Sequence, residues 1–120
     1  MLELGITEDE PDRPAKRIIS GPHRRHLSAG GVTLDRYTRF ATFGGGEIEL
    51  PKMEFFLLEF LMRRSPEFTS RTVIEKEVWR RELTSGTNVV EVYVNYLRQR
   101  FGKDYIATRR HDGYAILNPS

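Results

Sequence analysis

The sequence contains no cysteine, and this absence removes several kinds of chemistry at once. Without thiols the chain forms no disulfide, no thiolate zinc site and no cysteine nucleophile, which leaves histidine and carboxylates as metal ligands. Long apolar runs are also missing, because no stretch approaches the ~18 residues of a membrane-spanning helix. The first twenty residues lack the basic and apolar regions of a secretion signal. We therefore expect a protein without membrane contact that works in the cytoplasm.

A strong excess of one charge is absent as well, since 19 basic and 17 acidic residues leave a net charge of +2. So mild a balance does not by itself indicate a nucleic-acid or membrane partner. The distribution of the charges is more informative. Residues 1–12 hold five acidic and no basic residues, residues 13–25 hold five basic ones, and a second basic cluster occupies 98–110. Only the second cluster coincides with predicted secondary structure.

The length of 120 residues allows one compact domain, but not two of ordinary size. Residues 1–26 are rich in charge, proline and glycine and show neither helical nor strand periodicity. We predict a flexible charged tail over 1–26 and a single domain over 27–120.

Short antiparallel strands are predicted at both ends of this domain. Apolar residues alternate with polar ones at Val32 and Leu34, around Phe40 and Phe43, and over 47–50. We place turns at 35–37 and at the three glycines 44–46, which tolerate a positive φ. Two further strand-like runs, 105–108 and 114–117, flank Asp112-Gly113, a strong hairpin signal.

Three helices are predicted between these strands. The first follows Pro51 and is apolar almost all round over 53–62, with Glu54 and Glu59 as a narrow polar stripe. Ser70 is a good N-cap for a second helix, 71–80. Its Ile74 and Val78 are spaced to face the core, helped by Val73 and Trp79.

The third helix is predicted to begin at Asn88 as its cap and to run to about Phe101, where Gly102 stops it. Its opposite faces differ in chemistry. One face carries apolar residues at helical spacing, and the other is polar. The apolar face holds Val90, Val94, Leu97 and Phe101, and the polar face holds Val92, Asn95, Tyr96 and Gln99, flanked by Asn88, Arg98 and Arg100.

The polar face has the side-chain types that read a DNA major groove. Asn and Gln donate and accept together against adenine, Val or Tyr contacts a thymine methyl, and Arg reaches guanine or phosphate. A solvated surface helix shows a similar face, so the helix alone leaves both interpretations open. The order of a short helix, a loop, a polar-faced helix and an arginine-bearing hairpin favours a helix-turn-helix with a wing.

The sequence also resembles the effector domain of OmpR/PhoB-type response regulators over roughly residues 31–117. The resemblance implies an α+β winged-helix fold, with a four-stranded N-terminal antiparallel sheet, a three-helix core and a C-terminal β-hairpin wing. The short segments that match the family are, in chain order, Gly31-Val32-Thr33-Leu34-Asp35; Leu50 with Glu54-Phe55 and Leu57-Leu58; Ser70-Arg71 with Ile74 and Val78-Trp79; Val90-Glu91-Val92; Leu97-Arg98; and Ile106 with Thr108, Arg110 and Gly113-Tyr114.

The resemblance implies a role for particular residues. The third helix would read the major groove of double-stranded DNA, Arg110 would enter the minor groove, and Thr108 and Arg71 would touch phosphates or brace the wing. The predicted DNA-binding residues are Arg71, Asn88, Val92, Asn95, Tyr96, Arg98, Gln99, Arg100, Thr108, Arg110 and His111. The loop through which activators of this family meet RNA polymerase would comprise Arg80, Arg81, Glu82, Leu83, Thr84, Ser85, Gly86 and Thr87.

The chain departs from the family pattern in several places. His111 stands where the wing usually has a glycine, and Asp112 brings a negative charge near the expected phosphate path. Asn95 and Tyr96 fill slots that are often basic, and Pro51 replaces a common Thr cap. No receiver domain precedes residue 31. We expect either a stand-alone regulator that acts without a receiver domain or a fragment of a longer protein.

Other functions have less support. We expect no enzyme, cofactor or metal site, because the glycines at 44–46 lack the Lys-Ser/Thr of a P-loop, and His23 and His26 lie beside arginines. The principal alternative is a winged-helix protein-interaction module that binds RNA polymerase or another regulator. Aromatic residues such as Tyr93 and Tyr96 suit such a surface. The expected state is a monomer in solution that can form a tandem dimer on DNA.

Overall fold

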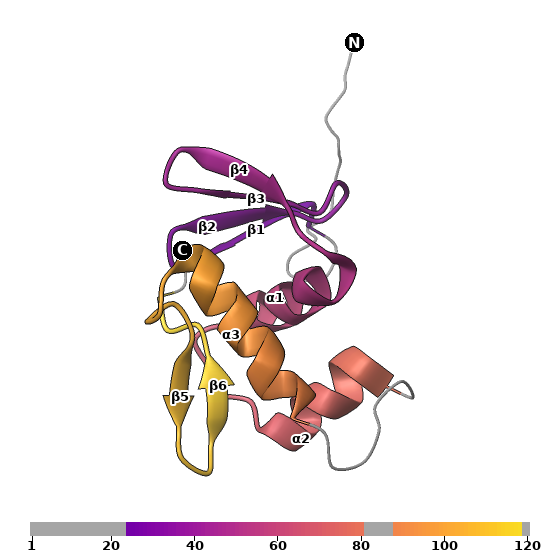
Figure 1. Cartoon of the computed structure of the whole chain (residues 1–120), viewed down its shortest axis with the longest axis vertical. Coiled ribbons are helices and arrows are strands. Elements are labelled where there is room, and N and C mark those ends of the chain that lie inside the picture. The colour runs from indigo at the N-terminus through magenta and orange to yellow at the C-terminus, as the bar shows by residue number, and fades with distance from the viewer. Residues whose placement is uncertain (1–23, 81–87, 119–120) are drawn as a thin grey trace.

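A computed structural model describes residues 24–80 and 88–118, and Figure 1 shows the sheet, the helices and the wing. The first elements of the described part form a four-stranded antiparallel sheet in the order β1-β2-β3-β4. The strands are β1 (His26–Ala29), β2 (Val32–Asp35), β3 (Phe40–Phe43) and β4 (Gly46–Glu49). The turns fall at 36–38 and at Gly44-Gly45, each within one residue of the predicted turns at 35–37 and 44–46. The first strand begins at His26, one residue before the boundary that we drew between tail and domain.

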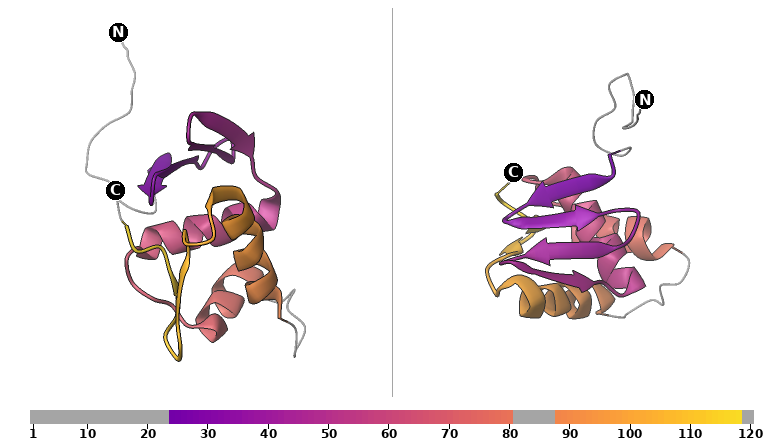
Figure 2. Two further views of the ribbon diagram at one scale, coloured as in Figure 1. Left: turned by 60° about the vertical axis from the view of Figure 1, so that its left-hand side comes forward. Right: turned by 90° about the horizontal axis from the view of Figure 1, so that it is seen from above.

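The sheet lies as a layer over the helices, which Figure 2 shows from above. Leu27, Ala29, Val32 and Leu34 alternate along β1 and β2 and are buried. They pack against α1 (Lys52–Arg64), which follows Pro51 and lies at the centre of the molecule. Because its neighbours cover it on several sides, seven of its residues are buried.

The narrow polar stripe predicted for α1 faces other elements of the protein. Glu54 is only 6% exposed and forms an ion pair with Arg100. Glu59 is bound by Arg36 from the turn after β2, with a nitrogen–oxygen distance of 2.6 Å. Both carboxylates therefore join α1 to its neighbours instead of facing water.

The second helix has two parts, α2 (Arg71–Ile74) and the π-helical η2 (Glu75–Trp79). Ser70 caps it as predicted, because its hydroxyl accepts a hydrogen bond of 3.2 Å from the Val73 amide. Ile74 and Trp79 are buried. The expectation that Val73 helps to form the core is wrong, since its side chain is 39% exposed. Val73 precedes the π-helical turn and is the sequence neighbour of the buried Ile74, about 100° away around the helix, so the two side chains face different sides.

The third helix, α3 (Val89–Phe101), packs against α1 and is shown in front of it in Figure 1. Its predicted apolar face is confirmed, because Val90, Val94, Leu97 and Phe101 are all buried. Gly102 ends the helix with a φ of +118°. Asn88 precedes the helix, but its side chain makes no capping hydrogen bond, so the predicted cap is wrong.

The C-terminal hairpin, or wing, consists of β5 (Ala107–Arg109) and β6 (Gly113–Ala115) and extends beside α3 (Figure 2). Thr69 and Tyr114 exchange two backbone hydrogen bonds of 2.9 and 3.0 Å, which attach β6 to the segment before α2. Gly113 makes this close approach feasible. A Cβ at this position would lie 1.9 Å from the Thr69 carbonyl oxygen, and the φ of +103° also favours glycine.

Candidate nucleic-acid interface

The exposed side of α3 carries a stripe of polar residues at helical spacing. We call this the α3 stripe, and it comprises Asn88, Val92, Asn95, Tyr96 and Gln99. The three amide side chains are exposed, Val92 is half-buried and Tyr96 is 41% exposed. Within the described residues none of the three amides has a hydrogen-bond partner, so each keeps its donor and acceptor available. The sequence had predicted this face, and its exposure is confirmed.

Tyr96 is held by an aromatic row at one side of the stripe. Its ring centroid lies 5.1 Å from that of Tyr93, which in turn lies 5.3 Å from that of Trp79, both in edge-to-face geometry. Such contacts restrict the orientation of a side chain. The stripe therefore presents a tyrosine supported by neighbouring rings together with exposed amides. Helical periodicity could not show that Trp79, from another helix, contacts Tyr93 and so supports Tyr96 indirectly.

Arg98, predicted as a recognition residue, points toward the wing. Its guanidinium donates to the Ile106 carbonyl from Nε (3.1 Å) and from Nη2 (2.7 Å), and Nη2 also donates to Thr108 Oγ1 at 2.7 Å. Thr108, predicted to touch phosphate or to brace the wing, thus receives a hydrogen bond from Arg98. These contacts place both residues at the junction of α3 and β5.

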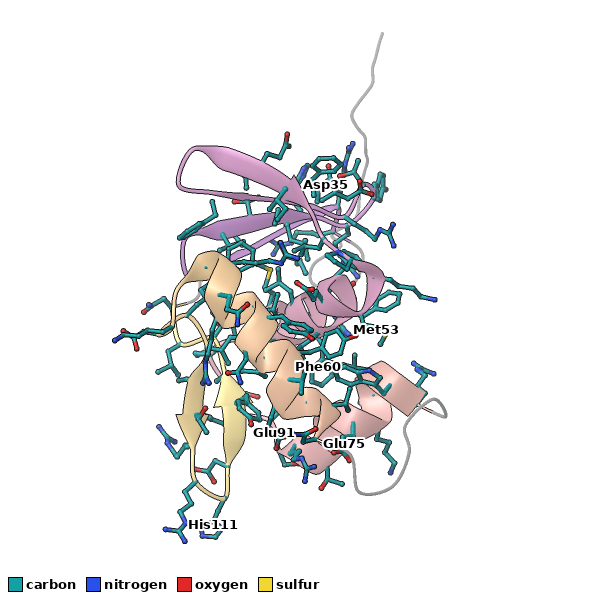
Figure 3. All side chains as sticks on the ribbon, viewed as in Figure 1. Asp35, Met53, Phe60, Glu75, Glu91 and His111 are labelled. Carbon is teal, nitrogen blue, oxygen red and sulfur yellow. The ribbon has the colours of Figure 1, made fainter. Side chains whose placement is uncertain are left out.

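Arg100 and Arg71 also have partners inside the protein. Arg100 Nε lies 2.5 Å from Glu54 Oε1, and Glu54 is almost completely buried. Arg71 forms ion pairs with Glu75 at 3.3 Å and with Glu91 at 2.9 Å. Figure 3 shows Glu75 and Glu91 near each other where α2 meets α3. None of these three carboxylates was predicted from the sequence to be a partner of the DNA-binding arginines.

The wing ends in a basic turn. Arg110 is exposed and has no side-chain partner among the described residues. His111 lies at the tip of the wing (Figure 3) and has a φ of +71°, so this residue adopts the left-handed conformation that a glycine would favour. The negative charge of Asp112 is partly offset by Arg109 at 3.6 Å, while Arg109 also lies over the ring of Phe68 at 4.1 Å.

The predicted polymerase-contact loop is largely outside the described residues, since 81–87 are not among them. Arg80, its first residue, is exposed and has a φ of +51°. It lines a hollow of about 440 Å³ between α1 and η2. Its lining includes the apolar residues Met53, Phe60 and Trp79 together with charged residues such as Glu77.

A second cluster of charges lies far from the α3 stripe, at the edge of the sheet. Arg25 forms a bidentate contact with Asp35 at 2.9–3.2 Å, and Asp35 also accepts from the backbone amides of Tyr37 and Thr38. Burial alone raises the pKa of Asp35, but these hydrogen bonds outweigh burial and lower the pKa from 3.8 to about 2. The cluster stabilises the turn after β2.

Residues 24–80 and 88–118 lack two further kinds of feature. No group of three or more His, Asp or Glu residues there is arranged to hold a metal ion. None of the helices described is both long and apolar enough to cross a membrane.

The sheet, the three-helix core and the wing beside an exposed α3 define a winged-helix domain of the kind that binds DNA. The chain belongs to the family described as "Transcriptional regulatory protein, C terminal", which matches residues 45–116. The OmpR/PhoB-type resemblance and the α+β winged-helix fold inferred from the sequence are thereby confirmed. This family consists of DNA-binding domains of transcriptional regulators and is not a known class of enzymes.

Similar proteins agree with this assignment. The transcriptional regulatory protein QseB of Escherichia coli O157:H7 is 39% identical over 102 residues, which are 83% of this chain and 46% of QseB. TrcR of Mycobacterium tuberculosis is 38% identical over 104 residues, which are 84% of this chain and 40% of TrcR. The chain therefore spans less than half the length of these curated relatives.

Solved structures show the same fold. The DNA-binding domain of CpxR from E. coli superposes with a TM-score of 0.66 at 25% identity, covering 79% of this chain and 98% of that domain. The DNA-binding domain of RstA from Klebsiella pneumoniae, solved in complex with the RstA box, has a TM-score of 0.66 at 24% identity. It covers 78% of this chain and 98% of the RstA chain.

Proposed function

We propose that this domain regulates transcription by binding specific double-stranded DNA, with α3 in the major groove and the wing in the adjacent minor groove. One observation carries the proposal: the α3 stripe presents amides without internal partners, and Arg110 on the neighbouring wing is likewise without one within the described residues. An α-helix fits the major groove, and an arginine suits the narrow, electronegative minor groove.

The two parts of the surface have different tasks. Asn95 and Gln99 can each pair with adenine through a donor and an acceptor, while Tyr96 and Val92 offer apolar contact to thymine methyls. Asn88 lies at the end of α3 where a phosphate or a base edge is within reach of a short amide. Arg110, with His111 beside it, supplies the wing contact. Arg71, Arg98, Arg100 and Thr108 act mainly through their contacts within the protein.

Binding to a randomised duplex library tests this assignment, followed by dissociation constants for the selected sequence at several salt concentrations. Asn95→Ala should change the preferred bases at one or two positions, because it removes a base contact. Arg110→Ala should weaken binding about tenfold and reduce the salt slope by about one, because it removes one cationic contact.

Arg63→Ala is the matched control for Arg110→Ala. It removes the same charge from the exposed side of α1, where Arg63 lies over the ring of Phe60. We expect it to leave affinity and preferred sequence nearly unchanged. If the wild-type protein selects no sequence and binds no duplex at low salt, the proposed function is wrong.

Protein partners form the second candidate function, supported by the hollow between α1 and η2. Its mixture of apolar and charged lining residues, Arg80 among them, suits a segment of RNA polymerase or of another regulator. Phe56→Ser and Met53→Ser, on α1 at the hollow, should then reduce activation in a reconstituted transcription reaction without changing DNA affinity. Loss of DNA affinity in these variants would contradict a separate protein-binding surface.

A tandem dimer on DNA remains the expected arrangement if the selected sequence contains a direct repeat.

A further inference from the structure

The wing is a two-stranded hairpin, and such a hairpin is at best marginally stable in water without support. Its two strands receive that support from different elements. β6 is attached through the exchange of backbone hydrogen bonds between Tyr114 and Thr69. On the other side, Arg98 reaches from α3 to the Ile106 carbonyl and the Thr108 hydroxyl, one before β5 and one within it. Arg98 therefore joins the helix that carries the α3 stripe to the strand that leads to Arg110.

We call this connection between α3 and β5 through Arg98 the joint. The planar guanidinium of Arg98 restricts its geometry. Nε and Nη2 lie in one plane and donate three hydrogen bonds to two acceptors, so that both the direction of the side chain and its distance from β5 are fixed. A charged donor also makes these bonds stronger than bonds between neutral groups. Arg98 is half-buried, which limits competition from water.

We propose that Arg98 is a positioning residue that sets the wing relative to α3, so that Arg110 meets the minor groove while the α3 stripe occupies the major groove. It acts on DNA through the wing, not by reading bases. The expected effect on DNA binding rests on the proposed function. The connection between Arg98 and the wing is a property of the protein without DNA. The two parts can therefore be tested separately.

A double-mutant cycle on the selected duplex tests the consequence for DNA binding. If Arg98 works through the wing, Arg110→Ala should weaken the wild type about tenfold but weaken the Arg98→Ala variant less than about twofold. Asn95→Ala should weaken both backgrounds by the same factor, because the stripe does not depend on the wing. Equal effects of Arg110→Ala in the two backgrounds would overturn the proposal.

Arg98→Lys separates positioning from direct phosphate contact. Lysine keeps the positive charge but cannot hold two acceptors with a planar fork. We expect this variant to bind DNA nearly as weakly as Arg98→Ala. If lysine restores wild-type affinity, Arg98 acts as a charge on the DNA backbone and the proposal is wrong.

Hydrogen exchange of the DNA-free protein tests the joint directly. Arg98→Ala should accelerate exchange of the amides of the wing, including Asp112, whose amide donates to the Arg109 carbonyl, by about tenfold or more. Amides of α1 should exchange as in the wild type, which establishes that the variant is folded. Gln99→Ala, one residue along α3, is the matched control and should leave the wing unchanged.

The outcomes distinguish the inference from the proposed function. Unchanged exchange in the wing of Arg98→Ala overturns the joint even when the wild type binds DNA. Accelerated exchange in a protein that binds no duplex overturns the proposed function and leaves the joint standing.

Discussion

His111 at the tip of the wing adopts a left-handed conformation, with a φ of +71°. A residue with a Cβ adopts this conformation at a cost of about 1–2 kcal/mol, which glycine avoids, although glycine's freedom in the unfolded chain offsets part of the gain. We therefore expect His111→Gly to raise the free energy of unfolding by about 0.5 kcal/mol. Urea denaturation at neutral pH measures the change.

The neighbouring Arg110 provides the control, because its φ is not among the positive ones. Arg110→Gly should lower the free energy of unfolding by about 0.5–1 kcal/mol, since only the entropy cost of glycine remains. Changes of the same sign in both variants would contradict the backbone conformation of this turn.

For single residues, the sequence predicted which side chains are exposed but not which partners they contact. The exposure of Asn95 and Gln99 followed from helical periodicity, which fixes the side of a helix on which a residue lies. Arg98 and Arg100 flank that side, and both were predicted to contact DNA. Their partners, Thr108 and Glu54, come from other elements, and a long side chain reaches such partners only once the fold is known.

Among the secondary-structure elements, α1 and α3 are joined by the ion pair between Glu54 and Arg100. Glu54 is almost completely buried, so neutralising it would leave Arg100 without its counter-charge in a partly desolvated place. We expect Glu54→Gln to lower the free energy of unfolding by about 1–3 kcal/mol, which is below the roughly 3–5 kcal/mol for a fully buried pair because Arg100 is partly exposed. Chemical denaturation at neutral pH provides the measurement.

The double variant Glu54→Met with Arg100→Met distinguishes the effect of an unpaired charge from the effect of altered packing. Removing both charges eliminates the desolvation cost, and methionine adapts to irregular space, so the double variant should recover most of the stability. If it is less stable than Glu54→Gln, the ion pair contributes more than the desolvation that it offsets.

The elements themselves were predicted unequally well. The wing and α3 were predictable because Asp112-Gly113 and the apolar spacing of α3 are strong local signals. β1 has only four residues and a weak alternation, so it entered only through the family resemblance. The π-helical turn of η2 was not predicted from any local pattern. Val73 was misplaced because it is next to Ile74 in the sequence, and neighbouring residues of a helix face different sides.

For the molecule as a whole, Asp35 makes the free energy of unfolding depend on pH. Its pKa is lowered from 3.8 to about 2 in the folded domain, where Arg25 and two backbone amides bind the charged carboxylate and His26 lies 3.5 Å away. A lowered folded-state pKa means that the stabilisation is complete above about pH 4 and is lost as the pH falls toward 2. We expect a loss of about 1–2 kcal/mol from this residue across that window, after allowance for solvent screening.

Asp35→Asn isolates this contribution, because the amide oxygen can still accept from the amides of Tyr37 and Thr38 and so preserve the turn. The variant should be less stable than the wild type at pH 7, and the difference should shrink steadily between pH 4 and pH 2 as protonation removes the wild type's advantage. Urea denaturation across this range measures it. Asp104→Asn, which changes an exposed carboxylate without a partner among the described residues, should keep a constant offset from the wild type. A constant offset for Asp35→Asn as well would mean that the sheet-edge cluster does not control acid unfolding.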